Sequence, residues 1–389
     1  MTDHRIAAPL LPGATIGMVG GGQLGRMFAL EARRMGYRLI VLDPGTDTPA
    51  AQFCDHHIRA PFEDLDACLE LARRSDVVTL EWENADVATL RAMGEHVRIH
   101  PSPDVLEVAQ HRVREKDAAR RLGVLTAEYR AVRTRGELDE ALREIGAPAI
   151  LKTARMGYDG KGQATIRSAA EADAAWEAVS TGADDFILEA RVPFRMEVSV
   201  VCARSASGEM ATFPVAENEH RGGILHLSVV PARVDAAVAA EAERVARTLA
   251  EGLGVVGLLA VEMFVDADDR ILVNEIAPRP HNSGHYTWEA CPVSQFEQQL
   301  RAVCGLPLGD TGLLRPAAMV NLMGEDAGTG LAVAGVADAL AVPGTALHLY
   351  GKAAARAGRK MGHLTALGDS ADQAAERALR AWGRMSGTE

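Results

Sequence analysis

Residues 257–276 read Gly-Leu-Leu-Ala-Val-Glu-Met-Phe-Val-Asp-Ala-Asp-Asp-Arg-Ile-Leu-Val-Asn-Glu-Ile, and two apolar runs around a polar turn predict a β-hairpin. If a four-residue loop joins the two strands, Asp266 pairs with Ile271 and Glu262 lies opposite Glu275. A register shifted by one residue would instead send one of these glutamates to solvent. The register of this hairpin therefore decides whether the chain carries a pair of facing carboxylates.

The predicted carboxylate pair points to a divalent cation. Two carboxylates that face each other across apolar strands repel, and a cation between them removes the repulsion. Oxygen ligands suit Mg²⁺, which usually keeps several waters and binds substrate phosphates through one or two carboxylates. Four polar residues follow the hairpin directly and favour this interpretation: Arg279, His281, Asn282 and His285.

The two histidines after the hairpin do not form a predicted zinc site. His281 and His285 are four residues apart, but Pro278 and Pro280 argue against a helix in this segment. Contacts to phosphate, carboxylate or substrate suit Arg279 and its neighbours better. Covalent acyl chemistry has no support either, because the chain contains no Gly-x-Ser-x-Gly nucleophile elbow.

The composition is that of an ordinary globular protein. The chain has 389 residues, enough for two or three domains, and 48% of them are hydrophobic and 24% charged. The best apolar run, 252–265, is too short for a membrane span and contains Glu262, and no export signal is evident. Five scattered cysteines suggest reduced thiols and a cytoplasmic location. The net charge of −12 argues against nucleic-acid binding.

Alternating strands and helices predict a doubly wound parallel sheet in the N-terminal part. The predicted elements are strands over 15–19, 38–42, 76–81 and 97–100 and a helix over 26–35. We place this Rossmann-like domain at residues 1–110. A mixed α+β domain follows at 111–312, and a helix over 104–122 leads into it. A small β-rich domain with a final helix over 370–382 completes the chain at 313–389.

A glycine-rich turn follows the first predicted strand. Residues 20–25 read Gly-Gly-Gly-Gln-Leu-Gly, and Asp43 ends the next strand. This is the dinucleotide-binding pattern, in which the glycines admit a pyrophosphate and the acid binds a ribose. A tight strand-to-helix turn explains the glycines without any cofactor. Because nothing downstream supplies hydride-transfer chemistry, a nicotinamide dehydrogenase is an alternative and not the leading hypothesis.

A second glycine-rich segment, 157–162, lies shortly after Lys152, which directly follows the predicted strand 149–151. Such a lysine can pair with nucleotide phosphates, and the glycines let backbone N–H groups approach phosphate oxygens. The segment is not a Walker A loop, because no Gly-Lys-Ser or Gly-Lys-Thr follows. The alternative is a surface hairpin turn.

A basic cluster near the C-terminal end consists of Lys352, Arg356, Arg359 and Lys360. Steering of a small anionic substrate depends on the local electrostatic field, so the overall negative charge of the chain does not exclude such a substrate. The cluster is therefore a candidate site for such a substrate, and a solvated loop is the alternative.

These segments together resemble the ATP-grasp enzymes, and within them the 5-(carboxyamino)imidazole ribonucleotide synthetase family. The resemblance covers nearly the whole chain. Its motifs lie at 20–27, 79–84, 111–116, 157–163, 214–220, 274–285 and 358–363. The strings at 274–285 and 358–363 are specific to this subfamily, whereas the glycine motif at 20–27 is not.

The resemblance implies which residues bind each ligand. ATP would be contacted by Arg112, Lys152, Gly157, Tyr158, Asp159, Gly160, Lys161, Gly162, Glu189, Ala190, Arg191, Val192, Glu197, His220, Asn274 and Glu275. Mg²⁺ (or Mn²⁺) would be held by Glu262 and Glu275. The substrate would lie near Glu81, Glu83, Tyr158, Asp159, Lys161, Arg279, His281 and Asn282, with its phosphate on Lys352, Arg359 and Lys360. The expected catalytic groups are Lys152, Arg279 and, for the amine proton, Asp159 or His281.

The resemblance also implies an activity. It is the carboxylation of aminoimidazole ribonucleotide by bicarbonate and ATP through carboxyphosphate, in de novo purine biosynthesis, by a homodimer that binds no nicotinamide. Another ATP-grasp carboxylase or a formyl-transferring ligase acting on a ribonucleotide is the alternative within the superfamily, and a non-catalytic nucleotide-binding regulator is one outside enzymes. Ala190 and Arg191 depart from the residues expected beside the adenine, which leaves the details of base recognition open.

Overall fold

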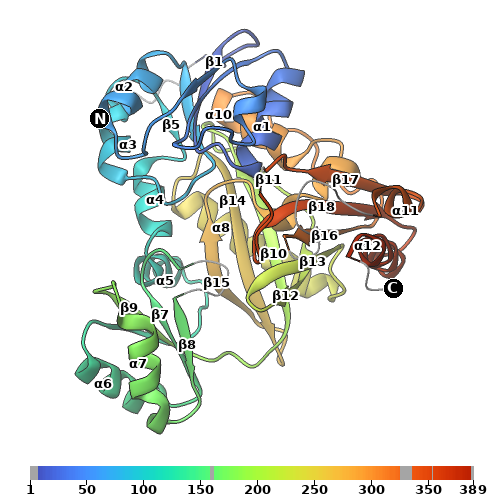
Figure 1. Ribbon diagram of the computed structural model, residues 1–389. Coiled ribbons are helices and arrows are strands. Elements are labelled where there is room, and N and C mark those ends of the chain that lie inside the picture. Colours follow the sequence, from blue (N-terminus) through green and yellow to red (C-terminus); the bar gives the residue numbers. More distant parts are fainter. Residues whose placement is uncertain (1–7, 158–161, 325–334, 353, 387–389) are drawn as a thin grey trace.

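The computed structural model describes residues 8–157, 162–324, 335–352 and 354–386. Their strands form a five-stranded, a four-stranded and a nine-stranded sheet. Figure 1 shows the first at the N-terminal end in blue, the second in the green segment, and the third through the centre and into the red C-terminal strands. The chain is therefore α/β with a β-rich C-terminal part, and the predicted fold class is confirmed.

The N-terminal sheet is parallel throughout and has the order β3-β2-β1-β4-β5. Its strands are β1 (Thr15–Val19), β2 (Arg38–Leu42), β3 (His56–Ile58), β4 (Val77–Leu80) and β5 (Ile99–His100). The helices that accompany it are α1 (Gln23–Arg34), η1 (Ala51–Phe53), α2 (Leu65–Arg73) and α3 (Val87–Gly94). The doubly wound pattern was predicted correctly, but α1 begins at Gln23 and not at Arg26, inside the glycine motif itself.

The glycine turn before α1 holds a carboxylate of this chain. The Gly22 N–H donates to Oε1 of Glu81 over 2.7 Å, and the Gly25 N–H donates to Oε2 over 3.1 Å. Asp43 is likewise engaged, because its Oδ2 accepts the Gly21 N–H over 2.8 Å. The first turn of a helix attracts anions, and here Glu81, at the end of β4, supplies one. The motif that suggested a dinucleotide therefore binds an internal acid.

The helix expected over 104–122 is two helices, so this prediction was wrong. They are α4 (Pro103–Ala109) and α5 (Arg112–Arg121), and His111 between them is extended, with φ −138° and ψ 105°. Long-range contacts compensate for the break. The Gln110 side chain donates to the carbonyls of Glu83 and Ala85, and the Arg112 N–H donates to the Ala154 carbonyl.

The small sheet is antiparallel and has the order β6-β9-β7-β8. Its strands are β6 (Tyr129–Val132), β7 (Ala149–Thr153), β8 (Gln163–Ile166) and β9 (Phe186–Ala190). It packs against α6 (Arg135–Ile145), η2 (Ala169–Glu171) and α7 (Ala172–Ser180), with a shared apolar core. Figure 1 shows this unit set apart from the rest of the molecule, next to α5. Lys152 lies inside β7, one residue beyond the strand expected from the sequence.

The nine-stranded sheet is the core of the molecule and has the order β15-β14-β10-β12-β13-β16-β18-β17, with β11 beside β10. Its strands are β10 (Phe194–Arg204), β11 (Met210–Thr212), β12 (Ala216–Arg221), β13 (Ile224–Val230), β14 (Gly257–Asp266), β15 (Ile271–Ala277), β16 (Ala317–Met323), β17 (Thr345–Leu349) and β18 (Lys360–Leu367). The accompanying helices are α8 (Ala236–Gly252), η3 (Asn282–Gly284), α9 (Thr287–Ala290), α10 (Gln295–Cys304), α11 (Val336–Leu340) and α12 (Ala371–Ser386). The C-terminal strands thus continue the central sheet, since β16 pairs with β13.

The β14–β15 hairpin brings Glu262 opposite Glu275, as predicted, but by a different route. Near the turn Val265, not Asp266, pairs with Ile271, so the predicted register is wrong by one residue there. A β-bulge between Glu262 and Met263 adds one residue on β15 and restores the predicted pairing at the glutamates. The two deviations cancel at the position that matters for the site.

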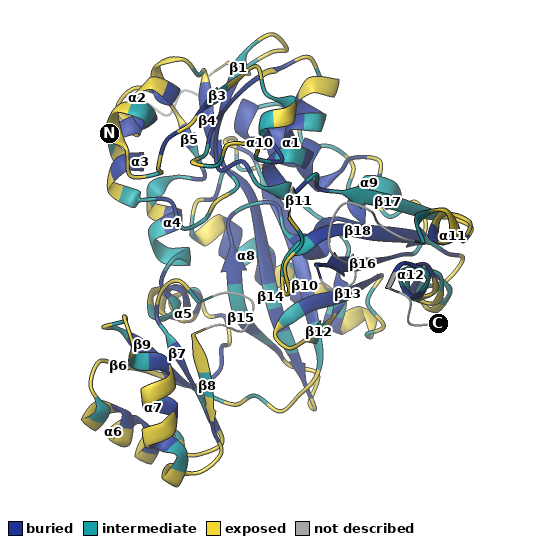
Figure 2. Ribbon diagram, in the orientation of Figure 1, coloured by how far each residue is buried: buried dark blue, intermediate teal, exposed yellow. Residues whose placement is uncertain are grey.

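Figure 2 shows that the strands of the central and N-terminal sheets are largely buried, whereas the helices expose one face. Within the described ranges, no helix combines the length and apolar character required to cross a bilayer. The five cysteines are free thiols.

Replacing Gly22 by alanine tests the internal carboxylate contact. An added Cβ would lie 2.7 Å from Oε1 of Glu81, although the Gly22 backbone (φ −74°) accepts any residue. We expect Gly22→Ala to lower the free energy of unfolding by about 1–3 kcal/mol, the usual cost of overpacking. Gly94→Ala is the matched control, because nothing lies within 4 Å of its added Cβ. Urea titrations of both variants provide the comparison, and equal stabilities would contradict the contact.

Candidate active site

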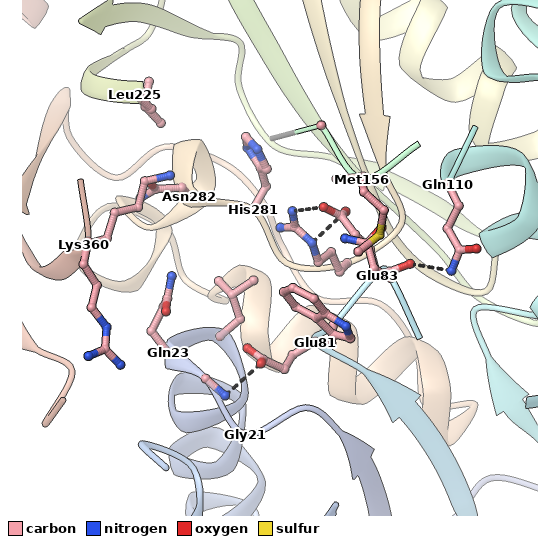
Figure 3. Close-up of a pocket in the computed structure, with 18 of the residues that line it drawn as sticks. Gly21, Gln23, Glu81, Glu83, Gln110, Met156, Leu225, His281, Asn282 and Lys360 are labelled. Carbon is pink, nitrogen blue, oxygen red and sulfur yellow. Dashed lines mark hydrogen bonds and ion pairs between the residues drawn. The ribbon is translucent and has the colours of Figure 1, made fainter. Parts of the chain in front are cut away.

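A cleft of about 1070 Å³ lies where the N-terminal domain, the hairpin and the C-terminal strands meet. Its walls include the glycine turn, the 43–49 loop, the 81–84 segment, the end of the hairpin and the 356–360 loop. In the view of Figure 3, Lys360 and Met156 lie at opposite sides, with Glu81 and His281 between them. Residues far apart in the chain therefore face one space.

The two facing glutamates form the acidic part of the cleft wall. Burial, and then the charge of Glu275, raise the pKa of Glu262 to about 7. Burial acts on Glu275 in the same direction and is the largest single influence, but the positive charges of Arg112, Lys152 and Arg279 together outweigh it and lower the Glu275 pKa. Arg112 Nη1 lies 3.2 Å from Glu275 Oε2. The pair therefore attracts positive charge.

His281 faces Glu262 with one defined ring nitrogen. Its Nδ1 accepts the Ser283 N–H over 3.3 Å and lies 2.9 Å from the Ser283 hydroxyl, while Nε2 lies 3.2 Å from Glu262 Oε1. Burial and the charge of Arg279 hold the His281 pKa well below its ordinary value, so the ring is neutral. With Nδ1 accepting, Nε2 carries the hydrogen and donates it to the carboxylate.

Arg279 joins the hairpin end to the N-terminal domain. Its Nε and Nη2 each donate over 2.8 Å to one oxygen of Glu83, a bidentate pair that fixes the plane of the guanidinium. Figure 3 shows this pair beside Gln110, which in turn donates to the Glu83 carbonyl over 2.8 Å. Arg279 Nη1 donates to the Pro280 carbonyl over 3.0 Å. The guanidinium is therefore held at the cleft wall by two domains.

Lys152 belongs to a buried charge cluster beside the small sheet. Its Nζ donates to Glu189 Oε2 over 2.8 Å, and Lys116 Nζ lies 3.4 Å from Glu189 Oε1. Burial alone would raise the Glu189 pKa, but the two ammonium groups lower it to about 2. Burial lowers the Lys152 pKa despite Glu189. Two lysines thus share one carboxylate, which leaves a surplus positive charge in this region.

The basic cluster predicted near the C-terminal end also faces the cleft. All four of its members line the wall: Lys352, Arg356, Arg359 and Lys360. Lys352 is buried, donates to the Lys360 carbonyl over 2.7 Å and lies over the Tyr350 ring. Arg359 donates to the Ala354 carbonyl over 2.8 Å. The cluster is organised by backbone contacts and shares the lining of the cleft with the acidic pair, and the charge of Lys360 acts to lower the Glu262 pKa.

Most of the residues expected at the site line this cleft: Glu81, Glu83, Arg112, Gly157, His220, Glu262, Glu275, Arg279, His281, Asn282, Lys352, Arg359 and Lys360. Others lie outside its described lining: Lys152, Gly162, Glu189, Ala190, Arg191, Val192, Glu197 and Asn274. Of these, Glu197 bonds the His220 ring over 2.7 Å, and the Ala190 and Arg191 N–H groups bond carbonyls. Four predicted residues fall outside the described parts of the chain: Tyr158, Asp159, Gly160 and Lys161.

Several lining residues were missed from the sequence: Gln23, Trp82, Gln110, Glu115, Met156 and Leu225. Glu115 is the one ionisable side chain among these six, and burial raises its pKa to about 8. Trp82, exposed beside Glu81, had a usable signal as a lone large aromatic between two acids. The other residues reach the cleft only through tertiary contacts. Asn282 was predicted, yet its amide already pairs reciprocally with Asn321 over 3.0 and 2.7 Å.

Three family models match successive parts of the chain. They describe the ribonucleotide synthetase preATP-grasp domain at 13–110, the ATP-grasp domain at 117–296 and the phosphoribosylaminoimidazole carboxylase C-terminal domain at 317–377. The N5-carboxyaminoimidazole ribonucleotide synthase of Bacillus subtilis (strain 168) is 44% identical over 378 residues, which is 97% of this chain and 98% of that relative.

Solved structures agree with these matches. An ADP complex of an N5-carboxyaminoimidazole ribonucleotide synthetase superposes with a TM-score of 0.92 at 47% identity, covering 98% of this chain and 100% of the other. The N5-carboxyaminoimidazole synthase from Aspergillus clavatus, in complex with ADP and 5-aminoimidazole ribonucleotide, gives 0.89 at 32% identity, with 98% and 100% covered. The chain therefore belongs to the N5-carboxyaminoimidazole ribonucleotide synthase family of ATP-grasp enzymes.

Proposed function

We propose that this chain is an ATP-dependent carbon–nitrogen ligase that carboxylates 5-aminoimidazole ribonucleotide with bicarbonate in de novo purine biosynthesis. The products are N5-carboxyaminoimidazole ribonucleotide, ADP and phosphate. One observation carries the proposal: a single cleft is lined both by an acidic pair, next to a lysine-rich region, and by a basic cluster. Such a cleft suits two phosphate-bearing substrates, of which only one requires a metal. The Aspergillus clavatus relative named above was solved in complex with both ADP and 5-aminoimidazole ribonucleotide.

The ATP would lie between the small sheet and the central sheet. Lys152 and Lys116 supply the surplus positive charge for its phosphates, and Arg112 lies between this cluster and Glu275. The loop from Gly157 to Gly162 would cover the phosphates with backbone N–H groups. Ala190, Arg191 and Val192 end β9 and begin the connection to β10, where a base can be read by backbone groups.

The acidic pair fits a magnesium ion. Burial raises the Glu262 pKa, so the paired carboxylates favour either a proton or a cation between them. The described residues contain no group of three or more His, Cys, Asp or Glu side chains arranged as a metal cage. A pair of carboxylates without such a cage suits Mg²⁺, which completes its coordination with waters and phosphate oxygens. When bound, the ion would neutralise charge on the transferring phosphoryl group.

The acceptor nucleotide would lie across the cleft. Its phosphate would meet Lys352, Arg359 and Lys360, which places its aminoimidazole toward Glu81 and the hairpin end. The two basic clusters, one for the phosphates of each substrate, would orient the two substrates. Positioning supplies much of the acceleration in reactions of this kind.

The chemistry would proceed in two transfers. A bicarbonate oxygen attacks the γ-phosphorus of ATP, the bond to the β-phosphate oxygen breaks, and carboxyphosphate and ADP form. The acceptor amine then attacks the carboxyl carbon, the bond between that carbon and the phosphate oxygen breaks, and the amine proton leaves. Arg279 would orient the carboxyl group, because its guanidinium is fixed by Glu83. Asp159 or His281 would receive the proton, His281 only by releasing a bond at one ring nitrogen.

Carboxyphosphate is short-lived in water, so closure over the cleft matters for yield. The homodimer implied by the family resemblance stays a prediction that light scattering can check.

The activity itself is tested with ¹³C-bicarbonate, ATP, Mg²⁺ and aminoimidazole ribonucleotide. We expect ADP release that requires the nucleotide acceptor, together with a new ¹³C carbamate resonance in NMR spectra. Formate in place of bicarbonate tests the formyl-transferring alternative in the same assay. ADP release that does not depend on the acceptor, with no carbamate signal, would contradict the proposed function.

Neutralising either facing glutamate tests the metal role. Glu275→Gln and Glu262→Gln should raise the Mg²⁺ concentration for half-maximal rate and lower kcat by about 10²-fold or more. Because the raised Glu262 pKa means that its charge disfavours folding above pH 7, Glu262→Gln should leave the metal-free protein at least as stable at pH 8. Glu219→Gln, on an exposed position of β12, is the control. Mg²⁺ titrations of initial rates decide, and an unchanged requirement would refute the role.

Removing Glu189 tests the buried charge cluster. Glu189→Gln leaves Lys152 and Lys116 without their shared carboxylate, and we expect a loss of about 3–5 kcal/mol of stability at pH 7. The Glu189 pKa of about 2 lies below its unfolded value, so its contribution is present above pH ~4.3 and is lost as the pH falls toward 2. Urea unfolding at pH 7 and pH 3 measures this. A deficit that does not shrink at the lower pH would contradict the assignment.

A further inference from the structure

Helix α10 carries an unusual set of buried amides. Gln295, Gln298 and Gln299 have no exposed surface, although they are polar side chains in a short helix. Buried amides are costly unless they are hydrogen-bonded. Each of the three is bonded to backbone outside the helix, so α10 fixes neighbouring segments through its side chains.

Gln295 binds the segment that contains Arg279 and His281. Its Oε1 accepts the His281 N–H over 2.9 Å, and its Nε2 donates to the His281 carbonyl over 2.7 Å. The same Nε2 lies 3.0 Å from the His285 ring. The amide thus holds both backbone groups of His281, as a neighbouring strand would. Gly284 leaves the space for it, since a Cβ there would lie 2.6 Å from Gln295 Oε1.

The direction of His281 depends on this backbone. His281 is the N-cap residue of η3, and its ring reaches Glu262 on one side and Ser283 on the other. A rotation of its peptide groups would move both ring contacts and would also shift Arg279, two residues earlier. Among the residues that the structure describes, no other side chain bonds both the N–H and the carbonyl of His281.

Helix α10 is itself tied to the N-terminal domain. The Ser294 hydroxyl donates to Glu31 over 3.0 Å, and Glu297 forms an ion pair with Arg34. Gln299 donates to the Thr79 hydroxyl over 2.8 Å, on the strand that leads to Glu81 and Glu83. Helix α10 therefore fixes the position of His281 relative to the N-terminal domain, which would carry the acceptor nucleotide.

We propose that Gln295 is a positioning residue of the carboxyl-transfer step, through its hold on the His281 backbone. This rests on the proposed function for the identity of the step. Gln295 is not among the residues that line the cleft. Its amide fixes the backbone that places His281 next to the acidic pair and Arg279 next to Glu83. Without it, phosphoryl transfer from ATP persists, because the buried lysine cluster is untouched, but the carboxyl group is passed to the amine less efficiently.

Helix α10 provides a matched control. Gln298 makes the same pair of bonds, accepting the Gly309 N–H over 2.8 Å and donating to the Gly309 carbonyl over 2.9 Å. It has the same burial and lies on the same helix, but Gly309 does not line the cleft. Gln295→Met and Gln298→Met therefore remove equivalent bonds, one pair beside the cleft and one pair away from it.

The experiment compares two properties of the two variants: the rate of backbone hydrogen exchange, and the ratio of ADP released to carboxylated product formed. We expect exchange in the 279–285 peptide to rise at least tenfold in Gln295→Met only, and exchange around Gly309 to rise in Gln298→Met only. In turnover assays, Gln295→Met should lower kcat/KM for the acceptor by about 10- to 100-fold and raise the ratio of ADP released to carboxylated product. Gln298→Met should keep the wild-type ratio.

The outcomes separate the two proposals. Similar ratios of ADP to product in both methionine variants would reduce Gln295 to a structural residue, as would unchanged exchange at 279–285. If Gln295→Met fails to fold, Gly284→Ala, whose added Cβ would lie 2.6 Å from Gln295 Oε1, disturbs the same contact while keeping the amide, and the same contrasts apply to it. Absence of acceptor-dependent turnover in the wild type would overturn the proposed function alone, because the exchange contrast is independent of activity.

Discussion

Repulsion between Glu262 and Glu275 is the constraint around which the other elements are arranged. Each carboxylate has a partner from a different part of the chain: Arg112 from the start of α5 and His281 from the end of the hairpin. Arg112 can reach this position because α4 and α5 are separate helices. The pair is thus held by long-range contacts, an ion pair at Glu275 and a hydrogen bond from a neutral ring at Glu262.

The N-terminal domain uses a glycine turn, a feature typical of nucleotide sites, to position one of its own side chains. Its glycine turn has the spacing and context of a nucleotide site, yet its N–H groups bind the Glu81 carboxylate. The helix terminus therefore orients an acid at the cleft wall. The same acid lies beside Glu83, which holds Arg279, so this domain contributes position and charge more than it contributes a cofactor.

Local patterns were sufficient to predict the fold class and the hairpin, because periodicity and turn residues are short-range properties. The facing glutamates were predicted from a register that is wrong at the turn, and the bulge restores their pairing. The break at His111 was missed, since it is compensated by contacts of Gln110 and Arg112 to segments far away in sequence. The buried amides of α10 gave no signal for the same reason, and polar residues in a helix are usually assigned to its exposed face. Residue roles at the site came from family resemblance, and geometry adds which of them share the cleft.

The β-bulge in β15 has a consequence for how this hairpin can vary. Glu262 and Glu275 pair on one side of the bulge, where β14 is also paired with β10. On the other side, toward the turn, the register of the hairpin differs by one residue. A bulge of this kind can take up a residue gained or lost at the tip without rotating the strand behind it. The exposed end of the hairpin is thereby free to drift in length over evolution, while the acidic pair stays in phase.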